Sequence, residues 1–143
     1  MSVTPFTRTL TGPPPRLKAP PGACDTHMHF YSRAYPALPG TLNPPDATVA
    51  DYAQVQAWLG LERAVVVQPN AYGDDNRATM AGVAALGDNA RAVVVVKPGV
   101  ADEELDRLTK AGARGIRFMN LLGGTLTFAQ MDEMAARVKP FGW

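Results

Sequence analysis

What the sequence lacks narrows the classes of protein to which it can belong. The chain has a single cysteine, Cys24, so it forms no internal disulfide, and no apolar run approaches the roughly 18–20 residues of a membrane span. The formal net charge is only +1, which gives no reason to expect a nucleic acid or a membrane surface as a partner. The first residues carry no apolar stretch with a cleavage site. These features predict a globular cytoplasmic protein.

Histidine is also scarce, and the two that are present lie together. They are His27 and His29, in the segment ACDTHMHF at residues 23–30. Strict alternation along a strand places Asp25, His27 and His29 on one face and Cys24 on the other. With a rise of ~3.3 Å per residue, the two rings start about 6–7 Å apart. They are therefore close enough to converge on one metal ion or one small ligand.

Four short apolar segments alternate with four amphipathic ones after a proline-rich leader. Residues 1–22 are rich in proline and poor in large apolar side chains, which predicts an extended arm ahead of a domain at residues 23–143. The expected strands lie within residues 23–30, 63–70, 90–99 and 114–120, and the expected helices within 46–60, 74–87, 101–112 and 127–140. Apolar strands separated by helices predict an α/β fold with a parallel sheet, because parallel neighbours need crossover connections.

The histidine pair has a purely structural interpretation and a functional one. Two hydrogen-bonded histidines at the end of a strand need no ligand, and two are fewer than the three protein ligands of a catalytic zinc. The pair nevertheless lies at the carboxyl end of the first strand, where barrel and open-sheet enzymes place their sites. This position favours a functional pair.

Polar side chains also end the second and fourth expected strands. Alternation in RGIRFMN directs Arg117 inward, away from the helix-facing Ile116 and Phe118. Its guanidinium needs a carboxylate, supplied either by an internal acid such as Asp25 or by an anionic substrate.

In VVVQPN, at the end of the second expected strand, Gln68 and Asn70 are two residues apart, so their amides fall on one face. An amide offers both a donor and an acceptor, so these side chains are candidates for binding substrate oxygens. The alternative for both residues is that they close the loop with hydrogen bonds.

These segments resemble a known family. CDTHMHFY, RAVVVQPNAYGDDNRATM and ARAVVVVKPGVADEELDRLTKAGARGIRFMN, with the glycine-rich loop that follows, are similar in order and spacing to part of the amidohydrolase superfamily. The branch is that of 2-pyrone-4,6-dicarboxylate lactonase and D-galactarolactone isomerase, and the resemblance covers Gly22 to Trp143. It implies the amino-terminal half of a TIM-like barrel of eight β/α units. It also implies action on dicarboxylate lactones derived from sugars or aromatics, usually without a required metal.

The resemblance assigns roles to individual residues. It implies that His27 and His29 bind or polarise the lactone carbonyl, that Asn70 contacts substrate, and that Arg117 clamps a carboxylate. A second arginine, which the pyrone lactonase uses for its other carboxylate, is replaced at about Gly123. This departure favours a galactarolactone-like substrate.

The resemblance also implies that the chain stops before the later histidine and the aspartate that acts as proton-transfer base. An isolated half-barrel is then nearly inactive, and its two open strand edges favour self-association. Two other functions stay open. One is a zinc-dependent hydrolase or decarboxylase of the same superfamily, with His27 and His29 as ligands. The other is a small non-catalytic α/β module that binds an anion or a partner.

Overall fold

The computed structural model describes residues 9–42, 44–120 and 124–143, so Gly123 lies outside the described residues. The strands are β1 (Cys24–Met28), β2 (Arg63–Val67), β3 (Ala90–Val94) and β4 (Ala113–Ile116). The helices are α1 (Val49–Leu59), α2 (Arg77–Leu86), α3 (Asp102–Lys110) and α4 (Met131–Val138). Short 3₁₀ turns are η1 (Asn70–Tyr72), η2 (Gly87–Asn89), η3 (Phe128–Gln130) and η4 (Lys139–Phe141).

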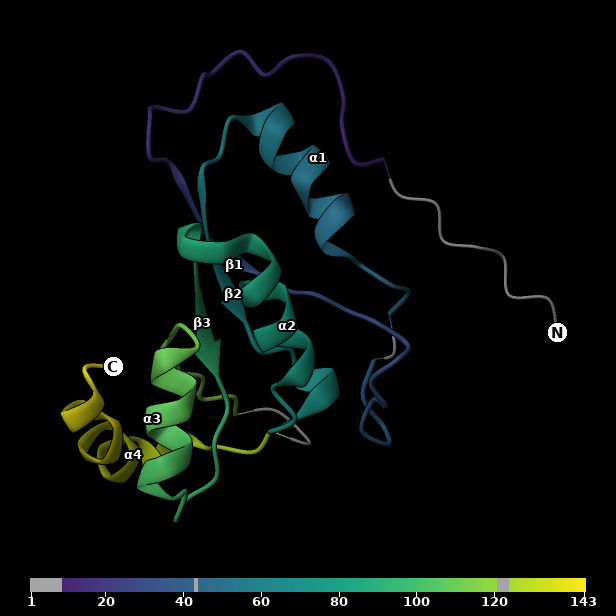
Figure 1. The fold of residues 1–143 in the computed structure, drawn as a ribbon. Coiled ribbons are helices and arrows are strands. Elements are labelled where there is room, and N and C mark those ends of the chain that lie inside the picture. Colours follow the sequence, from purple (N-terminus) through teal and green to yellow (C-terminus); the bar gives the residue numbers. More distant parts are fainter. Residues whose placement is uncertain (1–8, 43, 121–123) are drawn as a thin grey trace, which may run out of the picture.

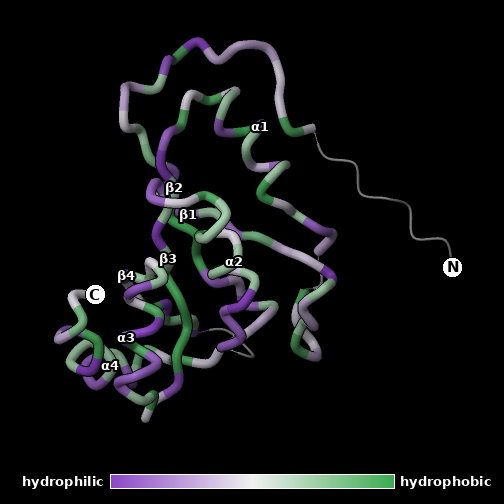
Figure 2. The backbone as a smooth tube through the Cα atoms, in the orientation of Figure 1, coloured by the Kyte–Doolittle hydropathy of each residue, from purple (hydrophilic) through white to green (hydrophobic). Residues whose placement is uncertain are grey.

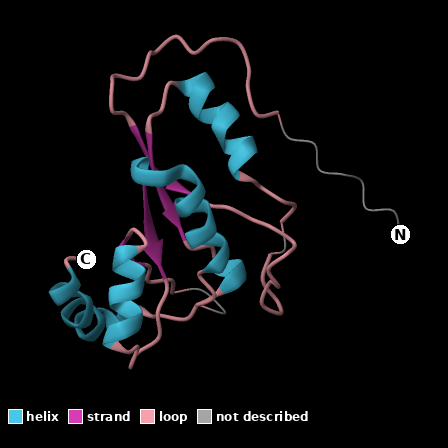
Figure 3. Ribbon diagram, viewed as in Figure 1, coloured by secondary structure: helices cyan, strands magenta, loops and turns pink. Residues whose placement is uncertain are grey.

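The four strands form one parallel sheet in the order β1-β2-β3-β4, and a helix follows each strand (Figure 1). The helices lie on the outside of the sheet, and the strands in Figure 3 run in the same direction. The predicted α/β class with four β/α units is confirmed. Because all strands are parallel, their carboxyl ends meet at one edge of the sheet, as in β/α barrels.

Local signals in the sequence explain where the helices begin and end. Thr48 and Asp51 form a reciprocal capping box at the start of α1, and Gly60 ends the helix in a left-handed conformation with φ of 72°. The first turn of α3 carries three acidic residues, and its last turn carries Arg107 and Lys110. Acidic residues at the amino end and basic residues at the carboxyl end both interact favourably with the helix dipole.

The main core lies between the sheet and its helices. Val66 and Val94 of the sheet meet Leu105 and Leu108 of α3 in one apolar cluster, and the tube in Figure 2 is hydrophobic along much of β3. Partly buried aliphatic and aromatic side chains after β4 pack against this cluster, namely Ile116 and Phe118. The predicted helix-facing orientation of these two residues is confirmed.

β1 departs from regular alternation, and this corrects the predicted position of Asp25. Asp25 pairs with Ala64, whereas Met28, three residues on, pairs with Val66, two residues on. The extra residue is a β-bulge, which turns Asp25 to the helix side of the sheet together with Met28. There the carboxylate of Asp25 accepts a hydrogen bond from Tyr52 of α1 at 3.1 Å. Asp25 therefore does not share a face with the histidines.

The described part of the leader, residues 9–22, runs along the outside of α1 (Figure 1). The indole Nε1 of Trp58 donates to the Pro13 carbonyl at 3.0 Å, and the Gly22 amide donates to Glu62 at 2.8 Å. These contacts attach the arm to the outer layer of the fold. Among the described helices, none has the length and apolar character needed to cross a membrane.

Candidate active site at the carboxyl ends of the strands

The two histidines converge at the end of β1. Their ring centroids lie 5.0 Å apart with an interplanar angle of 83°. The bulge in β1 lies between Asp25 and Met28, so His27 and His29 both point away from the helix layer that contacts Asp25 and Met28. The prediction that the imidazoles point the same way agrees with this geometry, although β1 contains a bulge and does not alternate regularly from Asp25 onward.

His29 is fixed by the neighbouring strand. Its Nδ1 lies 2.7 Å from the Val67 carbonyl oxygen at the end of β2. A carbonyl only accepts, so Nδ1 carries the proton and, in the neutral ring, Nε2 keeps a lone pair. Burial lowers the pKa of His29 below its ordinary value, and the positive charge of Arg117 acts in the same direction, while the Val67 hydrogen bond opposes both. His29 thus presents Nε2 as an acceptor or a metal ligand near neutral pH.

The lowered pKa of His29 predicts a pH-dependent stability. Because the unfolded chain, with a pKa near 6.5, binds the proton more readily than the folded one, protonation favours unfolding. The free energy of unfolding is expected to be highest above pH 6.5 and to fall as the pH drops through the lower pKa of the folded protein. Urea denaturation at a series of pH values measures this. His29→Asn keeps an amide donor for Val67 but does not titrate, so it should flatten the dependence. An equally steep dependence in both proteins would contradict the assignment.

Arg117 lies beside His29, although β4 and β1 are at opposite edges of the sheet. Its Nη1 donates to the Gln68 carbonyl at 2.6 Å, so Arg117 and His29 are anchored on consecutive carbonyls at the end of β2. Burial lowers the pKa of Arg117, and the neighbouring Tyr31 phenol opposes this. The guanidinium stays charged at neutral pH, because arginine titrates far above it.

The carboxylate partner expected for Arg117 is either Asp25 or an anionic substrate. Asp25 is directed to Tyr52 and to the His27 backbone, on the other side of the sheet. Across the described ranges 9–42, 44–120 and 124–143, no ion pair of Arg117 with a carboxylate is found. Among the described residues, the half-buried guanidinium hydrogen-bonds to the Gln68 carbonyl alone, so it retains donors for an anion. Asp25 is therefore not the carboxylate partner of Arg117.

Gln68 is fully buried, and its side chain closes the loop after β2. Nε2 donates to the carbonyls of Gly73 at 3.0 Å and Asp75 at 2.9 Å, and Oε1 accepts from the Thr79 hydroxyl at 2.5 Å. These contacts engage both amide hydrogens and the amide oxygen. The Gln68 side chain therefore closes the loop, as the alternative interpretation expects. Only its backbone carbonyl, which accepts from Arg117, contacts a described residue of the site.

Asn70 begins the turn η1 directly after Pro69 and is half-buried. Its backbone carbonyl accepts the Gly73 amide at 3.1 Å. The turn follows the carboxyl end of β2, so the position of Asn70 is compatible with substrate contact, and this role stays a prediction.

Tyr31 is a further neighbour of the site, two residues after His29 and therefore on the same face by alternation. Its ring centroid lies 6.0 Å from that of His29 and 6.2 Å from that of Tyr72. Burial raises the pKa of the Tyr31 phenol, and the Arg117 charge acts in the opposite direction. The sequence signals that could have found it are its spacing of two from His29 and its position after the strand that carries the histidine pair.

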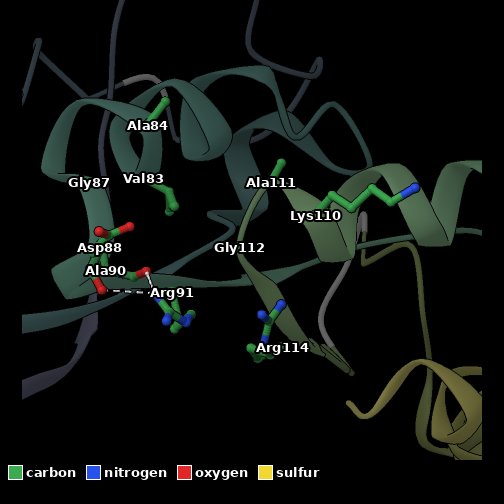
Figure 4. A pocket seen from close by; sticks show the side chains of 10 residues that line it. All are labelled: Val83, Ala84, Gly87, Asp88, Ala90, Arg91, Lys110, Ala111, Gly112 and Arg114. Carbon is green, nitrogen blue, oxygen red and sulfur yellow. Dashed lines mark hydrogen bonds between the residues drawn. The ribbon is translucent and has the colours of Figure 1, made fainter.

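A pocket of about 370 Å³ lies at the other end of the sheet (Figure 4). It is formed where α2 and α3 end and β3 and β4 begin. Arg91 donates to the Asp88 and Ala90 carbonyls, and Arg114 donates to the Thr109 carbonyl. Arginines that cap free carbonyls stabilise helix ends. The amino-terminal face of a β/α sheet also typically serves stability, so this pocket is not the candidate active site.

The donor set fits a metal ion only in part. His29 has its Nδ1 on a backbone carbonyl, which is the usual outer contact of a metal-binding imidazole, and His27 is its immediate neighbour. Within the part of the chain that the structure describes, no group of three or more His, Cys, Asp or Glu side chains gathers at metal-binding distance. The two histidines are therefore two possible ligands of a site that needs at least one more.

The parallel β/α units and the polar cluster at the carboxyl ends of the strands define a barrel-type α/β domain with its site at one edge. Comparison with protein families identifies this domain. The family model described as amidohydrolase matches residues 24–143, and the chain belongs to that family. The predicted family is confirmed.

Individual relatives agree with this assignment. The chain is 39% identical over 139 residues to D-galactarolactone isomerase from Agrobacterium fabrum, an alignment that covers 95% of the chain and 48% of the relative. It is 37% identical to 2-pyrone-4,6-dicarboxylate hydrolase from Comamonas testosteroni, covering 90% of the chain and 44% of the relative. An apo crystal structure of an Agrobacterium tumefaciens protein superposes with a TM-score of 0.78 at 37% identity, covering 91% of the chain and 48% of that structure. The chain thus spans about half the length of the relatives that it matches.

Proposed function

We propose that this chain forms the amino-terminal half of an enzyme that hydrolyses or isomerises a sugar-derived dicarboxylate lactone resembling galactarolactone. The observation that carries the proposal is the half-buried Arg117, held by one backbone carbonyl and placed beside His29. A planar guanidinium with unused donors suits a carboxylate. The names of the relatives, a galactarolactone isomerase and a pyrone dicarboxylate hydrolase, support a carboxylated lactone as the ligand.

The site residues take distinct roles in this proposal. Arg117 binds a carboxylate of the lactone and orients it. His29, with its proton on Nδ1, accepts a hydrogen bond at Nε2 from a substrate hydroxyl and orients the lactone. His27 donates to the lactone carbonyl oxygen, where negative charge develops. Asn70 contacts substrate, and Gln68 positions the loop that carries it.

The remaining catalytic groups come from a complementary half of the barrel in this proposal. The relatives extend over about twice the aligned length, and the family resemblance implies that an aspartate there acts as the base. Without that carboxylate the isolated chain lacks a contribution of about 10²–10⁴-fold to the rate. We expect the isolated chain to be nearly inactive and to self-associate through the open edges of β1 and β4.

The first experiment is the intact mass of the natural gene product, followed by assays on two lactones. A mass near twice the 15.3 kDa of this chain supports a complete barrel. That protein should turn over D-galactarolactone much faster than 2-pyrone-4,6-dicarboxylate. The reverse preference would overturn the proposed substrate, and no turnover of either lactone would overturn the proposed function.

A second candidate is a zinc-dependent hydrolase or decarboxylase of the same superfamily. The contact that favours it is the Nδ1 hydrogen bond of His29, which leaves Nε2 directed to a ligand. His27 and His29, with at least one further ligand, would hold the zinc ion, which would supply Lewis-acid activation of water. Stoichiometric zinc by elemental analysis, together with activity that is lost on chelation and restored by zinc, would select this candidate. Full lactone turnover by metal-free protein would exclude it.

A further inference from the structure

The bulge in β1 is held by one carboxylate that reaches in two directions. Oδ1 of Asp25 accepts the backbone N–H of His27 at 3.0 Å, and Oδ2 accepts the hydroxyl of Tyr52 at 3.1 Å. A bulge removes an amide from the ladder of hydrogen bonds between strands. The Asp25 side chain therefore replaces the missing backbone partner of His27.

Tyr52 connects this carboxylate to the helix layer. It belongs to α1, is 7% exposed, and packs its ring against Phe30 with centroids 6.0 Å apart. Burial raises the pKa of the Tyr52 phenol far above its ordinary value, with the Asp25 charge as a further cause. The phenol therefore stays protonated and acts as a permanent donor. Phe30 adjoins His29 in the chain, so Tyr52 supports the histidine segment from both sides.

The geometry of the site depends on the register that this contact stabilises. Shifting a strand by one residue moves each side chain to the opposite face. In a regular strand, residues 25 and 28 lie on opposite faces. Without the extra residue, Asp25 would therefore lie on the inner face when Met28 packs against the core. Hydrogen bonds to a charged acceptor are about twice as strong as neutral ones. The carboxylate is therefore well suited to hold an otherwise unpaired amide.

We propose that Asp25 and Tyr52 are a positioning pair that fixes the bulge of β1 and thereby directs His27 and His29 into the site. The inference deepens the proposed function and rests on it for its effect on turnover. Neither residue touches the lactone. Their role is to keep the imidazoles at a productive distance, where an error of about 1 Å can cost 10²-fold in rate.

Three variants separate positioning from charge. Asp25→Ala removes both hydrogen bonds, and in the complete enzyme kcat should fall about 10- to 100-fold while KM stays within about twofold. Asp25→Asn keeps an oxygen for the His27 amide and an amide donor for the Tyr52 oxygen, so it should retain kcat within about threefold. Thr26→Ala changes an exposed side chain in the same bulge and is the matched control. A kcat as low in Asp25→Asn as in Asp25→Ala would overturn the proposal.

Amide hydrogen exchange tests the same contact without any lactone assay. In Asp25→Ala the His27 amide should exchange about 10- to 100-fold faster, because a hydrogen bond to a charged group is lost. The Val66 amide in β2 reports whether the sheet itself stays intact. Unchanged exchange at His27 would overturn the positioning role. Absence of lactone turnover in the unmodified enzyme would instead overturn the proposed function, and the exchange result would still decide the role of Asp25.

Discussion

Arg117→Ala is expected to lower kcat/KM for a dicarboxylate lactone by about 10²–10³-fold, the loss typical of removing one charge-stabilising donor from an active site. Arg117 is half-buried, bonds to the Gln68 carbonyl and lies beside His29. Truncation leaves the substrate carboxylate desolvated without a partner, which is the costly case for a charged pair. Steady-state kinetics on the complete enzyme with D-galactarolactone measures the effect. A loss below about threefold would remove Arg117 from the site.

Two control variants show whether the loss comes from the guanidinium fork at this position. Arg117→Lys retains the charge but lacks the planar pair of donors, so it should recover only part of the activity. Arg114→Ala removes an exposed arginine near the start of β4, the strand that Arg117 follows, where its side chain donates to the Thr109 carbonyl. It should leave kcat/KM within about threefold, because this end of the strand lies away from the site. Equal losses in the Arg117 and Arg114 variants would indicate a general effect of charge.

Periodicity in the sequence was sufficient to predict the sheet, although the strands are shorter than the expected segments, with β2 ending at Val67 and β3 at Val94. Blocks such as RAVVV and ARAVV are apolar on both faces, and parallel pairing follows because each is separated from the next by an amphipathic segment. The convergence of His27 with His29 also follows from a spacing of two. The order of strands then places Arg117 at the same edge, as the structure shows.

Two features of the site depend on contacts that alternation does not encode. The face of Asp25 is set by a bulge, which arises when the Met28 and Tyr52 contacts outweigh regular pairing of β1 with β2. The role of Gln68 is set by carbonyls of Gly73 and Asp75, which approach its amide only after the loop has folded. In both cases a side chain satisfies backbone groups, and such pairs leave no periodic signal.

Gln68→Glu is expected to reduce the free energy of unfolding by about 3–5 kcal/mol at neutral pH, the usual cost of leaving a charge buried without a partner. The side chain is 0% exposed and donates two hydrogen bonds, to the carbonyls of Gly73 and Asp75. A carboxylate has no proton to donate and instead places negative charge against two carbonyl oxygens. Urea denaturation followed by circular dichroism measures the change.

The pH dependence of the Gln68→Glu variant distinguishes a buried charge from a mere loss of hydrogen bonds. Burial raises the pKa of the introduced carboxyl, so its stability is greatest below the unfolded pKa of about 4.3 and is lost as the pH rises through the folded value. Gln68→Met has a similar volume and no polar atoms, so it should cost about 2–3 kcal/mol for the groups left unpaired, with no added pH dependence. A destabilisation of Gln68→Glu that is the same at pH values of about 4.5 and 7.5 would show that water reaches the side chain. In that case the loop after β2 opens in solution, and the Gln68 amide would be accessible to substrate after all.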